Sequence, residues 1–200
     1  MTDYFALLKE QRRPWLNPDL LKQRFLALSA EVHPDRVHGA DDLQKRIAQE
    51  HYAELNAAYN CLREPKERLA HLLELETGAK PKQVQNVPSD LMDAFMEITN
   101  TCRGADAFLA ERNAMTSPLL KLQFFERGQE WNEKLMALQK KINSWREDLF
   151  ARIKDIDGEW EKNAGERKGS LELLEKNCQL LGYFGRWSAQ IQERIVQLSL

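Results

Sequence analysis

The residues best suited to chemistry lie in one short polar segment, His33-Pro34-Asp35, with His38 close behind. An imidazole and a carboxylate at this spacing could ligate a metal ion, with His38 as a third ligand. Against this, Pro34 stiffens the backbone and no fourth ligand is evident. A proline-fixed bend can instead present His33 and Asp35 to a partner protein at low cost in ordering entropy. A third interpretation is that the segment only caps a helix hairpin.

Other catalytic and cofactor signatures are absent from the sequence. It contains no GxSxG, GxGxxG, GxxxxGK[ST] or HExxH pattern and only four histidines. Its three cysteines are odd in number and far apart, so they form neither a disulfide framework nor a CxxC metal pair. Cys61 and Cys178 fall on or near apolar stripes, which predicts inert core thiols. We therefore expect no enzyme activity, no cofactor and no resident metal.

Composition and charge argue against several further classes of protein. The 200 residues carry 29 basic and 31 acidic side chains, a net charge of −2 that disfavours binding to nucleic acid. No run of about 18 apolar residues suggests a membrane span. The first residues lack the apolar core of a signal peptide, and acidic side chains weaken a transit-peptide interpretation. A reduced, cytoplasmic location is the expectation.

Two long helices are predicted on either side of the polar segment. Asn17 can cap a helix over 17–32, which must stop before Pro34, and a second helix is predicted over 41–63. Each has an apolar stripe at helical spacing, so the two should pack as an antiparallel hairpin. The stripes are Leu21, Phe25, Leu28 and Val32, then Leu43, Ile47, His51, Leu55, Tyr59 and Leu62. A shorter helix after Pro65 should end at Gly78.

The C-terminal part predicts an elongated helical bundle. A heptad-like stripe runs from Trp131 to Trp160 almost without a break, and helices over 89–102 and 171–198 would pack against it. The predicted fold is therefore all-α. The predicted domains are residues 1–75, a linker over 76–88, and a three-helix bundle over 89–200.

The setting of the HPD segment resembles the J-domain of the DnaJ co-chaperones. There, too, the tripeptide lies between two long helices, and the first of them carries basic residues, here Lys22 and Arg24. The resemblance implies four helices that bind an Hsp70 chaperone and stimulate its ATP hydrolysis. It further implies a surface that contacts the Hsp70. In this surface Pro34 sets the backbone geometry, and charged side chains support the contact. The residues of this surface are His33, Pro34, Asp35, Lys22, Arg24 and Arg36.

A second resemblance narrows the family to HscB, the J-protein of iron–sulfur cluster assembly. It rests on Asn56, Ala58, Tyr59, Leu62, Pro65, Arg68, Ala70, Leu72, Leu73 and Gly78. Leu26 and Ala27 stand where general DnaJ proteins carry two basic residues, which also favours HscB. The resemblance implies an Hsp70 of HscA or DnaK type as one partner. As the client, it implies an iron–sulfur scaffold of IscU type held by the bundle.

The resemblance also implies a client-binding patch on the bundle. The matching residues are Leu91, Met92, Phe95 and Tyr183. Met92, Met96 and Phe184 lie off the inward stripe, where they could form an exposed apolar patch. Met96, Thr99 and Arg103 depart from the family pattern, which has acidic residues there. Plain core packing is the alternative for Leu91, Met92, Phe95 and Tyr183. A J-protein with another client or a general Hsp70, and an adaptor without Hsp70 activity, also remain open.

Overall fold

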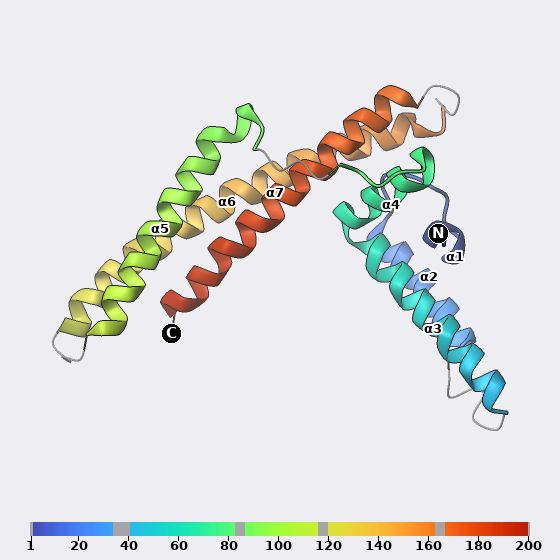
Figure 1. Ribbon diagram of the computed structural model, residues 1–200, viewed down its shortest axis with the longest axis horizontal. Helices are drawn as coiled ribbons and strands as arrows, with labels where there is room; N and C mark the ends of the chain where they lie inside the picture. Colours follow the sequence, from blue (N-terminus) through green and yellow to red (C-terminus); the bar gives the residue numbers. More distant parts are fainter. Residues whose placement is uncertain (1, 34–40, 83–86, 116–119, 163–166, 200) are drawn as a thin grey trace. The chain divides into compact units, whose positions relative to one another are not determined.

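The chain is all-helical, as predicted. The computed structural model describes residues 2–33, 41–82, 87–115, 120–162 and 167–199, with only the backbone described at 120–123. Within these ranges there are seven α-helices, one 3₁₀ turn and no strand (Figure 1). They are α1 (Tyr4–Leu7), α2 (Pro18–Glu31), α3 (Asp42–Arg63), α4 (Pro65–Thr77), η2 (Ser89–Leu91), α5 (Met92–Ala114), α6 (Leu120–Trp160) and α7 (Lys168–Ser199). No described helix is long and apolar enough to cross a membrane.

The helices form two compact units. The first contains Met1–Lys82 and Ala151–Gln179, and the second contains Gln83–Phe150 and Leu180–Leu200. The end of α6 and the beginning of α7 therefore belong with α1–α4, while the rest of both helices belongs with α5. The domain boundaries expected from the sequence stay a prediction.

The hairpin of α2 and α3 begins at two side-chain caps. The Asn17 Oδ1 atom accepts hydrogen bonds from the backbone N–H groups of Asp19 at 3.0 Å and Leu20 at 3.2 Å, which confirms the predicted cap. The Asp41 carboxylate accepts one from the Gln44 N–H at 2.8 Å. These bonds satisfy donors that the first turn of a helix leaves without partners, so both helix starts are set locally.

Apolar side chains join the two helices of the hairpin. The rings of Phe25 and Tyr59 stack with centroids 4.3 Å apart and planes 9° from parallel. Leu21, Leu55 and Leu62 are almost fully buried. Burial of each such side chain contributes about 1.5–3 kcal/mol to stability. The predicted stripes therefore pack together in the half of the hairpin that contains the start of α2 and the end of α3.

The predicted stripe on α3 is not buried over its whole length. Leu43 and Ile47 are 67% and 57% exposed. The imidazole of His33, just past the end of α2, contacts the Tyr52 ring. The first turns of α3 precede Tyr52, so no described residue of α2 lies opposite them. The helical spacing was correct, but helices of unequal length leave part of the stripe exposed.

The second unit is built on the apolar stripe of α6. Leu135, Leu138, Ile142 and Leu149 are buried there, as the heptad pattern predicts. The same stripe continues in the first unit with Ile153 and Trp160, which are also buried. Along this helix, therefore, most residues of the predicted stripe are core residues, while Trp131, Trp145 and Ile156 are half-buried.

A glycine allows α5 and α6 to approach closely. A Cβ atom added to Gly104 would lie 2.3 Å from the Cη2 atom of Trp131. No side chain fits at that distance unless the indole moves. The lack of a side chain at residue 104 is therefore a packing requirement of the second unit.

We expect Gly104→Ala to destabilise the chain. Overpacking against Trp131 should lower the free energy of unfolding by about 1–3 kcal/mol, despite the higher helix propensity of alanine. Gly185→Ala in α7 is the matched control, because a Cβ there meets nothing within 4 Å. That variant should gain about 0.5–1 kcal/mol. Urea unfolding followed by circular dichroism measures both, and equal shifts would contradict the packing argument.

Candidate functional site

His33 lies at the end of the helix hairpin and is half-buried. Helix α2 ends at Glu31, and the imidazole meets the Tyr52 ring of α3 edge-on, with centroids 5.4 Å apart. This contact holds the first residue of the HPD segment against α3 while part of the ring stays accessible. Pro34, Asp35, Arg36 and His38 lie outside the described residues.

The two basic residues predicted on α2 have different surroundings. Lys22 is exposed and forms no ion pair with any described residue. Arg24 forms an ion pair with Glu10 at 3.1 Å and donates a hydrogen bond to the Lys9 carbonyl. Lys9 has a φ of 54°, a left-handed conformation that is costly for a residue with a side chain. Arg24 therefore also holds the segment after α1, and Lys22 is the freer of the two charges.

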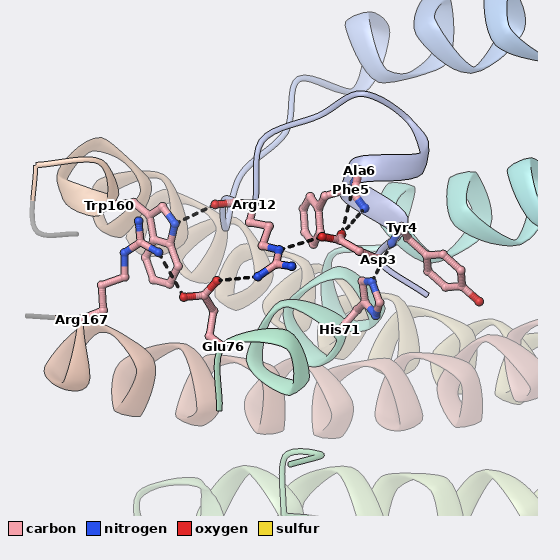
Figure 2. Close-up of polar contacts among 9 residues, drawn as sticks. All are labelled: Asp3, Tyr4, Phe5, Ala6, Arg12, His71, Glu76, Trp160 and Arg167. Carbon is pink, nitrogen blue, oxygen red and sulfur yellow. Dashed lines mark hydrogen bonds and ion pairs between the residues drawn. The ribbon is translucent and has the colours of Figure 1, made fainter. Parts of the chain in front are cut away.

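A polar network in the first unit ties the N-terminal segment to α4, α6 and α7 (Figure 2). The Arg12 guanidinium pairs with Asp3 at 2.8 Å and lies 3.8 Å from Glu76, which also pairs with Arg167 at 3.1 Å. The Trp160 indole N–H donates to the Arg12 carbonyl at 2.8 Å. Four segments distant in sequence thus meet at one chain of charges and donors.

His71 of α4 anchors α1 in the same network. Its Nε2 atom accepts a hydrogen bond from the Tyr4 backbone N–H at 3.1 Å, and its ring stacks on Tyr4 and Phe5. Burial lowers the pKa of His71, partly offset by the negative charges of Asp3 and Glu74. The acceptor role requires the neutral ring, so this contact works only in the deprotonated form.

A buried carboxylate on α6 holds the segment before α2. Asp157, only 7% exposed, accepts hydrogen bonds from the Arg13 guanidinium and from the Trp15 backbone N–H, the latter at 3.0 Å. The Trp15 ring lies between two cations, with Arg68 5.6 Å and Lys154 4.5 Å from its centroid. This cluster fastens the segment before α2 to both α4 and α6.

Arg68 is a buried cation within this cluster. Burial lowers its pKa to about 10, opposed chiefly by the charge of Asp157, so it remains charged at neutral pH. It donates hydrogen bonds to the carbonyls of Pro14 at 2.9 Å and Leu62 at 2.7 Å. The local sequence did not indicate the roles of Asp157 and Arg13. The available signal was a charged residue, Asp157, inside the apolar stripe of α6.

The predicted client patch is divided between surface and core in the second unit. Met92 and Met96 are 43% and 49% exposed, and Leu91 and Phe95 are half-buried. Tyr183 and Phe184 are buried, at 5% and 3% exposure.

The expectation that Phe184 is exposed was therefore wrong. Its ring packs 5.6 Å from Trp145 of α6, while Trp187, one turn later, faces Phe95 of α5 at 6.5 Å. Because α7 contacts both other helices, its buried face is wider than a single stripe, and residues off that stripe are buried too.

The cysteines and the acidic residues offer no chemistry among the described residues. Burial raises the pKa of Cys61 and of Cys178 to about 11, so both thiols stay protonated at neutral pH. Cys178 is a core residue, as expected, whereas Cys61 is only half-buried. No group of three or more His, Cys, Asp or Glu side chains in the described ranges could hold a metal ion.

Comparison with known proteins identifies the family. No protein-family model matches the chain. It is 35% identical over 74 residues to a co-chaperone protein HscB homolog of Shewanella loihica, a match over 37% of this chain and under half (43%) of that relative. It is 34% identical over 131 residues to the HscB homolog of Burkholderia mallei, covering 60% of this chain and 74% of that protein. The chain belongs to the HscB co-chaperone family.

Solved HscB structures share the fold over nearly the whole chain. The chaperone HscB from Vibrio cholerae matches with a TM-score of 0.67 and 17% identity over 98% of this chain and 99% of that one. Human co-chaperone protein HscB matches with a TM-score of 0.68 and 17% identity over 96% and 82%. Family membership makes the chain a J-domain co-chaperone and not an enzyme.

The anchoring of α1 by His71 should make stability depend on pH. Because the folded-state pKa of His71 is lowered, the unfolded chain binds this proton more readily between that pKa and about 6.5. The stabilisation is present above about pH 6.5 and is lost as the pH falls below it. We expect His71→Gln to reduce the loss of unfolding free energy between pH 7.5 and 5.5, measured with urea.

The unmodified chain, measured with urea at the same two pH values, is the reference for this change. An unchanged dependence in His71→Gln would contradict the proposed role of the Tyr4 hydrogen bond.

Proposed function

We propose that this chain stimulates ATP hydrolysis by an Hsp70 of HscA or DnaK type and delivers to it an iron–sulfur scaffold protein of IscU type. The observation that carries this proposal is membership of the HscB family in a chain that places an HPD segment directly after α2. A cytoplasmic site of action fits this role. The hairpin would supply the Hsp70 contact, and the second unit would hold the client.

The geometry of the hairpin supports the Hsp70 contact. Tyr52 holds the His33 ring at the end of α2, so little ordering entropy is lost when a partner binds it. Lys22, exposed on the same helix, can steer an acidic surface toward the segment. Pro34, Asp35 and Arg36 are assigned to this contact from the sequence, where the carboxylate suits an arginine of the partner.

The stimulation requires no covalent chemistry from this chain. A partner that binds the hydrolysis-competent state of Hsp70 more tightly than its resting state shifts the population toward the competent state. A tenfold rise in the hydrolysis rate corresponds to a barrier lower by about 1.4 kcal/mol, which a few contacts can supply.

The surface of α5 supports a client contact. Met92 and Met96 are large apolar side chains about half exposed to solvent and one turn apart on α5, so a partner could bury them together. Leu91 and Phe95 lie beside them and are half-buried. Tyr183 and Phe184 would act from the core, as support beneath the patch. Holding the client and Hsp70 on one chain raises their effective concentration for each other.

Two other functions make different demands on the same residues. A J-protein with a different client, or one serving a general Hsp70, would use His33 but not the scaffold. A helical adaptor without Hsp70 activity would use neither His33 nor Asp35. The two experiments below separate these possibilities, since one tests the Hsp70 contact and the other the client.

We expect His33→Gln to abolish stimulation of steady-state ATP hydrolysis by the partner Hsp70. The unmodified chain should raise the rate about tenfold, and loss of the imidazole contact should return it to the basal value. His51→Gln, which alters an exposed histidine on α3, should stimulate like the unmodified chain. Equal stimulation by the His33 and His51 variants would exclude the proposed Hsp70 contact.

We expect Met92→Asp to weaken binding of an IscU-type scaffold by about tenfold or more, because a charge replaces an apolar contact at the centre of the patch. Met136→Asp is the control, since Met136 is equally apolar and 55% exposed but lies on α6. Isothermal titration calorimetry measures both affinities. Similar losses in the two variants would mean that the patch does not bind the scaffold.

A further inference from the structure

One face of α5 combines apolar side chains with a positive charge. Met92, Met96, Thr99 and Arg103 follow one another at intervals of four, three and four residues, which places them on the same side of the helix. Both methionines and Arg103 are exposed, and Thr99 is half-buried. We name these four residues the outer face of α5.

The other two sides of α5 are occupied by neighbouring helices. Toward α6, Gly104 meets the Trp131 ring, and toward α7 the Phe95 ring faces Trp187. The outer face is therefore the side that remains available to another molecule. Its methionines can adapt to an irregular apolar surface, because their side chains are unbranched and flexible.

The acidic residues beside the outer face already have partners. Glu97 forms an ion pair with Lys141 of α6 at 2.7 Å, and Asp106 forms one with Arg194 of α7 at 2.7 Å. Arg103 lies between these two acids in the sequence but forms no ion pair with any described residue. Its charge is therefore available to a partner in a way that the charges of Glu97 and Asp106 are not.

Two further acids lie at the start of the helix. Asp90 and Asp93 are exposed there, and Asp93 occupies the first turn of α5, where the positive end of the helix dipole favours it. Both precede Met96, whereas Arg103 is seven residues beyond it, or about 10 Å along the helix axis. The far end of the outer face is therefore basic.

We infer that Arg103 is a specificity determinant for the client, and that the client presents apolar groups to Met92 and Met96 and a carboxylate to Arg103. This inference rests on the proposed client-binding function and adds the chemistry of the partner surface. A client that covers the outer face from Met92 to Arg103 would exclude water from the charge pair at Arg103 and so strengthen it.

The experiment measures the affinity of the full chain for the cognate IscU-type scaffold by calorimetry at 50 and 250 mM NaCl. Arg103→Glu should weaken binding at least tenfold at low salt, and Arg103→Gln should weaken it by a smaller factor. Higher salt should weaken binding of the unmodified chain but strengthen that of Arg103→Glu, because screening reduces attraction in one and repulsion in the other. Arg152→Glu, an equal charge change on the exposed side of α6, should bind like the unmodified chain.

Different results separate this inference from the proposed function. Tight binding by Arg103→Glu would overturn the inference and leave the scaffold as client. If the unmodified chain does not bind the scaffold, both the proposed client and the inference fail, whatever the effect on Hsp70. Self-association of the unmodified chain that Met96→Glu abolishes would identify the occupant as a second copy and also overturn it. Thermal unfolding of each variant checks that the exposed substitutions leave the fold intact.

Discussion

The N-terminal unit depends on one buried carboxylate. Asp157 of α6 accepts hydrogen bonds from the Arg13 side chain and the Trp15 backbone, and its charge helps to keep the buried Arg68 ionised. An ion removed from water in this way is tolerated only when its partners are complete, and breaking such a pair commonly costs about 3–5 kcal/mol. The segment that leads into α2, and hence the hairpin that carries His33, is therefore positioned by a residue more than a hundred positions away.

The same two long helices serve both units. Trp160 of α6 and Leu174 of α7 are buried in the first unit. Further along α7, Trp187 and Ile191 are buried in the second unit. Neither unit is a continuous piece of sequence. If the chain is an Hsp70 co-chaperone that carries a client, as we propose, each of its two contact surfaces belongs to a unit that α6 and α7 help to form.

The two parts of the predicted client patch, on α5 and on α7, differ in exposure because neighbouring helices cover different sides of these two helices. α7 has neighbours on two sides, so Tyr183 and Phe184 are taken into the core. α5 also contacts two helices but keeps a third side free, where Met92 and Met96 remain about half exposed. An apolar residue next to a predicted core stripe can therefore be core in one helix and surface in another, depending on which side of the helix its neighbours cover.

The sequence by itself determined the helices and the family. Asn17 marks the start of α2, Gly78 with its φ of 75° marks the end of α4, and the spacing from Trp131 to Trp160 predicted the core side of α6. These features depend on neighbours within one or two turns, so they can be read locally. The HPD segment between two such helices indicated a J-domain, and the residues from Asn56 to Gly78 narrowed the family to HscB.

Only the tertiary structure decided which charged groups hold the molecule together and which apolar groups remain outside. Arg13 and Asp157 are 144 residues apart, and nothing in their local sequences pairs them. The exposure of Leu43 and the burial of Phe184 likewise depend on where other helices end or pass. Ion pairing and burial are properties of the space around a side chain, and distant segments fill that space, so periodicity along one helix does not determine them.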